Sequence, residues 1–331
     1  MLSRNSPCVL VRLDRYQPVV SSYRIGDIDP CVAIPGSEAA TLIKLLALDL
    51  DGTLLNSRGE IPDANRKAIR TAEAAGVLVT IASGRRFRDA RPIGLELELN
   101  APLITHNGAL LKYAESQETV AADLIETETS LEIVRVGKAY GGDAFVSIDP
   151  KGPGTLIYDR VSDENEPLKR YLAWAETLHG DEAHDAVVHV DRLEDELPKH
   201  EVIHVSFSGT CDSMSRMFAY LEGEIGSKVT ILATIYPQRD FTLLDILPPN
   251  SSKGSGLAKL AAIIGIEANE VMAIGDNFND IEMLEFAGTS VVMGNADPSL
   301  LEREEFYTTL SNDEGGVATA IERVILNQEK S

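Results

Sequence analysis

The sequence predicts an α/β protein with a doubly wound, Rossmann-like parallel sheet and an inserted α+β module. Short apolar runs recur along the chain, and each ends in polar residues and glycine, as buried parallel strands do. Helical patterns separate the first of these runs, which is the order that a doubly wound sheet requires. Between residues 126 and 237 the pattern changes to helices mixed with β-rich stretches, which indicates a second kind of unit.

The composition limits the possible partners. The chain has 331 residues, of which 44% are hydrophobic and 25% charged, and its formal net charge is -22. This acidic balance disfavours nucleic acid and anionic membranes as partners, because binding them depends on basic side chains. No apolar run reaches the roughly 18 residues of a spanning helix. The three cysteines lie far apart and indicate neither a disulfide framework nor a zinc site. We therefore expect a cytoplasmic monomer or homodimer that acts on a small molecule.

The chain divides into four segments. Residues 1–40 mix charged residues with scattered prolines and serines and have no sustained periodicity, so we expect a poorly ordered extension without an assigned function. We expect the first part of the core at residues 41–125, the inserted module at 126–237 and the second part of the core at 238–331.

The first chemical motif follows an apolar run that begins at Leu45. The run ends in Asp49 and Asp51, and Gly52 and Thr53 come next. Side chains two positions apart in a strand point to the same side, so we expect the two carboxylates to lie together. Two such acids repel each other and lose solvation, which favours a hard divalent cation such as Mg²⁺ between them. On its own this pattern is more often an ordinary acidic turn, so the other motifs must decide.

Two further predicted strands end in polar side chains. A helical pattern with Pro at its start and Gly at its end leads to the run at 77–82, which stops before Ser83. A third run, at 102–105, stops shortly before Asn107. The carboxyl ends of parallel strands line one crevice in a doubly wound sheet, so these side chains should converge with the two aspartates. Ser83 taken alone could equally be a helix N-cap.

The inserted module carries no chemical motif. We expect helices packed on a mainly antiparallel sheet. Five of the six histidines lie here without the spacing of a metal site, so we interpret them as surface or satisfied core residues. The predicted helices are 131–140, 167–178 and 213–224, and the predicted strands are 144–148, 155–158, 202–208 and 229–235.

The core pattern resumes near Phe241. Lys253 begins an amphipathic helix, where the helix dipole disfavours a cation, so its position makes sense if an anion binds there. A solvated surface lysine is the ordinary alternative. Another buried strand, at 271–274, leads into Asp276 and Asp280, in a turn rich in acids and amides. The ordered series of a calcium loop is absent from this turn.

Together the strand ends supply a carboxylate pair, a hydroxyl, a lysine and a second acidic cluster. These are the parts that phosphoryl transfer to a carboxylate requires: a nucleophile, an acid/base, a magnesium site and donors for the phosphoryl oxygens. Each part alone is a weak signal, but four of them in order favour an enzyme.

In these motifs the sequence resembles the haloacid dehalogenase (HAD) superfamily of aspartate-nucleophile phosphohydrolases, and within it the Cof-type branch with a large type-IIB (C2B) cap. The resemblance begins at about residue 43, is strong in the core and is loose in the module. The stretches that carry it are 49–55, 82–85, 106–109, 253–257, 275–284, 293–296 and 312–318.

The resemblance implies a Mg²⁺-dependent phosphoric monoester hydrolase that acts on small phosphorylated metabolites, sugar phosphates above all. Asp49 would attack phosphorus and form an aspartyl-phosphate, and Asp51 would protonate the leaving group and then activate water. Mg²⁺ would contact Asp49, the backbone carbonyl of Asp51 and Asp276, with Asp280 orienting a metal-bound water. We expect attraction to Lys253 to keep Asp49 ionised at neutral pH.

The same resemblance implies that the inserted module is a cap that closes over the substrate. It also implies substrate contacts, or a place beside the substrate, for Thr53, Ser83, Gly84, Arg85, Asn107, Gly108 and Asn279.

Other functions remain open. A phosphomutase or other phosphotransferase would use the same nucleophile with another acceptor. A non-catalytic phosphate-sensing module is a further alternative, although the intact Asp49 and Asp51 count against it. Receiver domains also combine acids, Mg²⁺ and lysine, but they are short and carry the phosphorylated aspartate on a middle strand.

Overall fold

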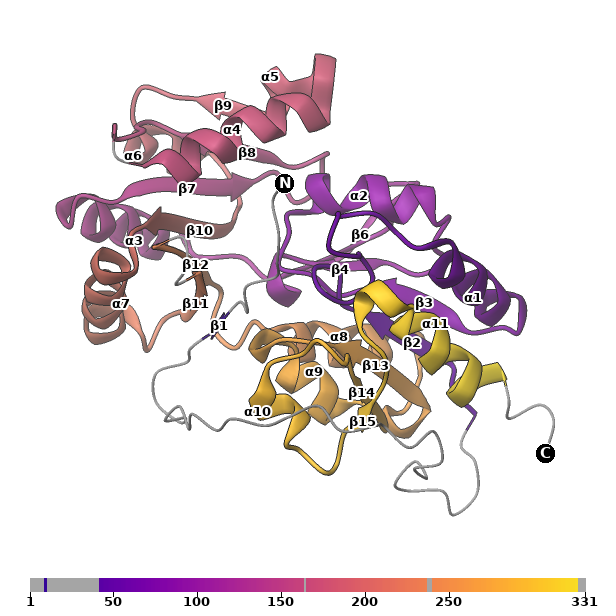
Figure 1. Ribbon diagram of the computed structural model, residues 1–331. Coiled ribbons are helices and arrows are strands. Elements are labelled where there is room, and N and C mark those ends of the chain that lie inside the picture. The colour runs from indigo at the N-terminus through magenta and orange to yellow at the C-terminus, as the bar shows by residue number, and fades with distance from the viewer. Residues whose placement is uncertain (1–8, 11–41, 164, 237–239, 327–331) are drawn as a thin grey trace.

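The computed structural model describes residues 9–10, 42–163, 165–236 and 240–326 (Figure 1). Two larger sheets form its framework, a five-stranded parallel sheet and a seven-stranded mixed sheet, and a three-stranded sheet accompanies them. The mixed sheet lies at the upper left of Figure 1 and the parallel sheet below it. The predicted class, a doubly wound parallel core with a separate α+β sheet, is confirmed.

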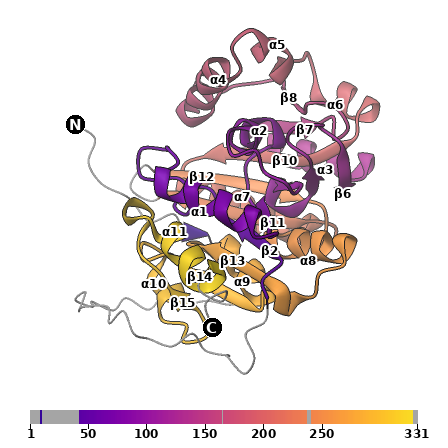
Figure 2. The same cartoon turned by 90° about the vertical axis from the view of Figure 1, so that its right-hand side faces the viewer.

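The parallel sheet has the strand order β15-β14-β13-β2-β3. In β2, Leu46 and Leu48 pack on one face and Leu45 and Ala47 on the other, which explains why helices cover both faces (Figure 2). The first face is covered by α1 (Asp63–Ala74) and α11 (Gly316–Ile321), and the second by α8 (Lys253–Ile264) and α9 (Ile281–Phe286). The strands are β2 (Leu45–Leu48), β3 (Leu78–Ile81), β13 (Val271–Gly275), β14 (Thr289–Val292) and β15 (Tyr307–Thr308).

The third predicted strand exists as β4 (Leu103–Thr105), after helix α2 (Phe87–Glu96), but its pairing differs from the prediction. It pairs antiparallel with β5 (Leu110–Lys112), which pairs with β6 (Thr119–Ala122). One parallel bridge, Ala82 with Ile104, links it to the strand before it. A single turn of 3-10 helix, His106–Gly108, reverses the chain after β4, and such a short connection allows only an antiparallel partner.

The module's sheet has the order β1-β11-β12-β10-β7-β8-β9 and is mainly antiparallel, as expected. Helices α3 and α7 pack on one face, and α4 packs on the other. The helices are α3 (Thr127–Ala139), α4 (Glu166–His179), α5 (Ala183–Ala186), α6 (Leu193–Glu196) and α7 (Cys211–Ile225). The strands are β7 (Asp143–Ile148), β8 (Thr155–Tyr158), β9 (Val187–His189), β10 (Val202–Gly209), β11 (Thr230–Tyr236) and β12 (Phe241–Leu247).

Strand β12 differs from the expectation that the core resumes near Phe241. It pairs antiparallel with both β10 and β11, and its Leu244 and Ile246 belong to the module's apolar core. A short apolar run does not reveal which sheet it joins, so the sequence could not place it. Residue 237, the expected end of the module, lies outside the described residues.

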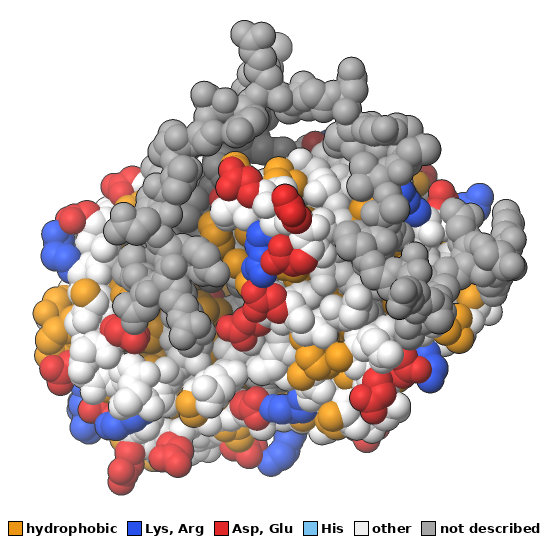
Figure 3. Space-filling view, turned by 90° about the horizontal axis from the view of Figure 1, so that it is seen from below, with side chains coloured by type: hydrophobic (Ala, Val, Ile, Leu, Met, Phe, Trp, Pro, Cys, Tyr) orange, Lys and Arg blue, Asp and Glu red, His pale blue; other side chains and the backbone are white. Residues whose placement is uncertain are grey.

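The predicted extension is described only at β1 (Val9–Leu10), which pairs with β11, and the rest of residues 1–40 lies outside the description. The remaining short helix of the core is α10 (Pro298–Leu301). None of the described helices is long and apolar enough to span a membrane. On the face shown in Figure 3, acidic side chains are spread among apolar and basic ones, in keeping with the net charge of -22.

Candidate active site

The loop after β2 positions Asp49. The backbone N–H of Asp49 donates to the carbonyl of Ile274 in β13 at 3.0 Å, so the loop starts where these two neighbouring strands end. Because β2 ends at Leu48, strand alternation does not direct the side chains of Asp49 and Asp51. Asp49 is buried, whereas the side chain of Asp51 is 62% exposed. The two aspartates therefore lie in different surroundings.

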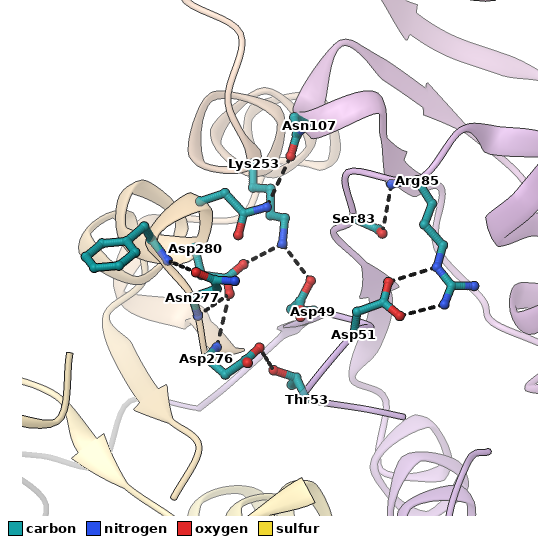
Figure 4. Close-up of polar contacts among 12 residues, drawn as sticks. Asp49, Asp51, Thr53, Ser83, Arg85, Asn107, Lys253, Asp276, Asn277 and Asp280 are labelled. Atoms are coloured by element: carbon teal, nitrogen blue, oxygen red, sulfur yellow. Dashed lines mark hydrogen bonds and ion pairs between the residues drawn. The ribbon is translucent and has the colours of Figure 1, made fainter. Parts of the chain in front are cut away.

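Asp51 pairs with Arg85. Nε and Nη2 of Arg85 donate to the two carboxylate oxygens of Asp51 at 2.8 and 2.6 Å (Figure 4). The backbone N–H of Arg85 donates to Oγ of Ser83 at 3.1 Å. A bidentate pair of this kind has a fixed geometry, so Arg85 orients the carboxylate. A guanidinium thus neutralises the Asp51 side chain, where we expected a cation shared with Asp49.

Lys253 is buried between two carboxylates and is not the solvated lysine of the alternative interpretation. Its Nζ donates to Oδ1 of Asp49 and to Oδ1 of Asp280, each at 2.6 Å (Figure 4). It is the first residue of α8, and the side chain of Ser252 caps that helix. The two carboxylates offset the unfavourable position of a cation at a helix N-terminus.

The turn after β13 brings Asp276 and Asp280 to Asp49. Carboxylate oxygens of the three aspartates lie within 4.8 Å of one another. Oδ2 of Asp280 accepts hydrogen bonds from the backbone N–H groups of Asp276 and Asn277, both at 3.0 Å, and Thr53 Oγ1 donates to Oδ1 of Asp276 at 3.0 Å. The second oxygens of Asp49 and Asp276 accept no hydrogen bond from any described residue. These two oxygens are available to a ligand.

Three carboxylates share one lysine here, and the pKa values reflect the imbalance. Burial raises the pKa of Asp49 to about 7, and repulsion from Asp280 adds to this against the lowering effect of Lys253. Burial and repulsion from Asp49 and Asp280 also raise the pKa of Asp276 well above its usual value. Lys253 thus lowers the pKa of Asp49, the direction that we expected, but burial and the repulsion from Asp280 outweigh it. Oxygen donors with an excess of negative charge fit Mg²⁺.

Two glycines allow the loops to approach closely. Gly52 has a φ of +94°, and a Cβ there would lie 2.3 Å from Oδ2 of Asp276. Gly108 has a φ of +95°, and a Cβ there would lie 1.9 Å from the carbonyl oxygen of Ser252. A side chain at either position would push the β2 loop or the start of α8 away from the site.

The loops after β3 and β4 are joined beside the site. Ser83 is buried and is not a helix N-cap, because Arg86 occupies the N-cap position of α2. The backbone N–H of Asn107 donates to the carbonyl of Ser83 at 3.1 Å, and Nδ2 of Asn279 donates to Oδ1 of Asn107 at 3.3 Å. At Gly84 a Cβ would lie only 3.0 Å from Oδ1 of Asn107.

Two asparagines without a predicted role brace the β2 loop. Nδ2 of Asn295 donates to the carbonyl of Gly52 at 2.8 Å, and its Oδ1 accepts the backbone N–H of Asn312 at 2.8 Å. Nδ2 of Asn312 donates to the carbonyl of Leu55 at 2.8 Å. Both asparagines lie in stretches that carry the family resemblance, and this was the one feature of the sequence that could have pointed to a role for them.

The structure thus arranges the predicted residues in three connected groups. Among the described residues, the three aspartates are the group of His, Cys, Asp and Glu side chains placed to hold a metal ion. The groups are Asp49, Thr53, Lys253, Asp276 and Asp280; Asp51, Ser83 and Arg85; and Asn107 with Asn279, beside Gly84 and Gly108.

The sequence matches the haloacid dehalogenase-like hydrolase family over residues 46–321. It is 30% identical over 298 residues to the 5-amino-6-(5-phospho-D-ribitylamino)uracil phosphatase YwtE of Bacillus subtilis, covering 86% of this chain and 99% of that protein. It is 30% identical over 263 residues to the pyridoxal phosphate phosphatase YbhA of Escherichia coli, covering 78% and 91%.

A solved haloacid dehalogenase-like hydrolase from Bacteroides thetaiotaomicron has the same fold, with a TM-score of 0.69 and 28% identity over 85% of this chain and 99% of that one. The family predicted from the sequence motifs is confirmed. The chain therefore belongs to the haloacid dehalogenase-like hydrolases, and its relatives there place it among the phosphoric monoester hydrolases.

Proposed function

We propose that this chain is a Mg²⁺-dependent phosphatase that hydrolyses small phosphorylated metabolites through an aspartyl-phosphate on Asp49. One observation carries the proposal. Asp49 is buried at the end of a central strand, is held at one oxygen by Lys253, and keeps the other oxygen available beside Asp276. That is the arrangement a carboxylate nucleophile next to a cation requires.

Asp49, Asp276 and the backbone carbonyl of Asp51 are the groups that would hold Mg²⁺. The bound ion would supply positive charge to the phosphoryl oxygens. Both oxygens of Asp280 are bonded to protein donors, so we assign this residue to fixing Lys253 and the turn at Asp276, in place of the role that the resemblance implied, the orientation of a metal-bound water.

The reaction has two displacements at phosphorus. The available oxygen of Asp49 attacks phosphorus and the bond to the ester oxygen breaks. Asp51, in its protonated form and released by Arg85 at one oxygen, donates its proton to that ester oxygen. Water then attacks the aspartyl-phosphate, Asp51 takes the proton of the water, and inorganic phosphate leaves Asp49 free. Ser83 and Lys253 donate to the phosphoryl oxygens. Arg85 presents Asp51 on the exposed side of the site, where a leaving group has room.

The inserted module, from residue 126 through β12, is the proposed cap over this site. The two phosphatase relatives are named for different substrates, a ribitylaminouracil phosphate and pyridoxal phosphate. The alcohol parts of these two substrates differ, and the common feature is the phosphate monoester. The proposed substrate class is therefore the small phosphate monoester, sugar phosphates included. A cytoplasmic monomer or homodimer without nucleic-acid or membrane partners remains the expected form.

The test is a phosphate-release screen over a panel of phosphorylated metabolites, with and without Mg²⁺. We expect release from some esters with Mg²⁺, loss of release in EDTA, and recovery when Mg²⁺ is restored. A folded protein that releases phosphate from no ester in the presence of Mg²⁺ would overturn the proposal. Transfer of the phosphoryl group to a second sugar hydroxyl, in place of release, would favour the phosphomutase alternative.

A further inference from the structure

A second buried charged cluster lies where the module meets the core, and its centre is Asp89 on α2. Arg86 donates to its carboxylate through Nε and Nη2 at 2.8 and 3.0 Å. The hydroxyl of Tyr171 donates to Oδ2 at 3.0 Å, and Nε2 of His179 lies 2.9 Å from Oδ1. Tyr171 and His179 belong to α4 of the module, so one core carboxylate binds both units.

The cluster is complete without a ligand. Asp89 is 5% exposed and Arg86 is 7% exposed. Burial acts to raise the pKa of Asp89, but attraction to Arg86 and the hydrogen bonds from His179 and Tyr171 outweigh it and hold the pKa well below its usual value. The ring of Tyr171 also lies under the Arg86 guanidinium, 5.4 Å from it.

Core side chains in and beside the cluster also donate to backbone carbonyls of the module. Three basic residues make these contacts, so this part of the seam is polar, as interfaces between units that move relative to each other commonly are. They are Arg86 to Ala186 at 3.4 Å, Arg88 to Gly154 at 3.2 Å, and Lys112 to Pro150 and Gly152 at 2.8 and 2.7 Å.

The cluster adjoins the proposed acid through the backbone. Arg86 directly follows Arg85, whose guanidinium holds Asp51. The carbonyl of Arg86 accepts the backbone N–H of Asp89 at 3.1 Å, which closes the first turn of α2. The loop is thus fixed on the core side at Ser83 and on the module side at Arg86.

We propose that Asp89 is a positioning residue that couples docking of the module to the orientation of Asp51, through Arg86 and Arg85. The inference rests on the proposed function, because it takes Asp51 as the acid. When α4 is docked, Tyr171 and His179 complete the donors around Asp89, and the backbone at Arg85 is held. When α4 is displaced, Asp89 loses two donors and water reaches its pair with Arg86.

The test compares leaving groups in variants that remove the module's two donors. We would make Tyr171→Phe with His179→Ala, and use Tyr140→Phe as the matched control, since Tyr140 is a partly exposed tyrosine of the module. An alkyl phosphate found in the screen needs a proton on its leaving oxygen, whereas p-nitrophenyl phosphate does not.

We expect kcat for the alkyl ester to fall about tenfold to a hundredfold in the double variant, which is the size of effect expected from losing hydrogen bonds to a charged group. The rate of phosphoenzyme formation from p-nitrophenyl phosphate should stay within about threefold of the wild-type rate. Tyr171→Phe with His179→Gln, which can restore one donor, should recover part of the loss. Equal losses on both esters, or no loss on either, would overturn the inference. A wild type inactive on both esters would instead count against the proposed function.

Hydrogen exchange gives a readout independent of activity. In the folded protein without substrate, the double variant should exchange the amides of residues 83–90 faster than wild type, and Tyr140→Phe should not. Unchanged exchange there, in a variant that has lost the contacts with α4, would contradict the coupling. Thermal unfolding of each variant separates a local change from loss of the fold.

Discussion

Two buried carboxylate clusters in this molecule respond to burial in opposite ways. In the candidate active site three aspartates lie together, Lys253 donates to two of them, and the pKa of Asp49 is raised to about 7. At the seam a single aspartate, Asp89, receives Arg86 and two further donors, and its pKa is held below the usual value. The direction of the pKa shift therefore depends on the number of hydrogen-bond donors per carboxylate more than on how deeply the carboxylate is buried. The cluster around Asp49 is short of positive charge and can bind a cation, whereas the cluster around Asp89 is balanced and stabilises the contact between the module and the core.

The largest expected effect is loss of turnover in Asp49→Asn. Removing the nucleophile should lower kcat at least about a thousandfold, whereas the protein should stay folded, because the substitution removes one charge from a cluster with excess negative charge. Initial rates with Mg²⁺ and thermal unfolding measure both effects, and Asp191→Asn, at an exposed module position, is the control. Activity within tenfold of wild type would exclude Asp49 as the nucleophile.

Asp51→Asn should have the next largest effect on turnover. Loss of the acid and base should slow steady-state hydrolysis of alkyl esters by about 10² to 10⁴. With p-nitrophenyl phosphate the first displacement should persist and the second should stall, so phosphoenzyme should accumulate. A rapid burst of p-nitrophenol, equal to the enzyme present, is the expected observation. The assignment fails if the variant turns over alkyl esters at the wild-type rate.

The contrast between the clusters can be measured as stability in metal-free protein. Asp89→Asn should cost about 3 to 5 kcal/mol, because it leaves the buried Arg86 without its partner. Asp276→Asn should cost little or increase the free energy of unfolding, because it relieves repulsion among the three aspartates. Urea denaturation measures both values. Equal destabilisation by the two substitutions would show that the clusters do not differ as described.

A smaller effect is expected at Asp245 in the module. Burial raises its pKa from the usual 3.8 to about 6, against one hydrogen bond from Ser206. A raised carboxyl pKa stabilises the fold at low pH, and this contribution is lost as the pH rises between those values. Asp245→Asn should remove that loss, so at pH 7 the variant should be up to about 3 kcal/mol more stable than wild type, with no gain at pH 3.5. Denaturation at several pH values tests this, and a gain independent of pH would contradict the cause.

The core and most of its site could be predicted because each motif directly follows a strand. Strand β2 pairs parallel with both β3 and β13, so the carboxyl ends of the three strands lie at one edge of the sheet. Local patterns at Asp49, Ser83 and Asp276 therefore sufficed to predict that these residues converge. The position of Lys253 at a helix start was unusual in the sequence, and its burial between two acids explains why.

The rest depends on contacts between distant segments. Asp89 lies 82 and 90 residues from Tyr171 and His179 in the chain, and no motif links them. The partners of β12 are likewise set by the module's packing. The raised pKa of Asp49 follows from burial together with the number of neighbouring charges, and a strand pattern specifies neither.

The position of β12 has a practical consequence for engineering. Because β12 lies between β11 and β10, it is an interior strand of the module's sheet. A chimaera spliced before Phe241 would leave the donor sheet without that strand and would graft an unpaired apolar ribbon onto the recipient. A transplant that takes Leu247 as its last residue keeps β12 between β11 and β10, and it leaves five residues of native linker before Lys253.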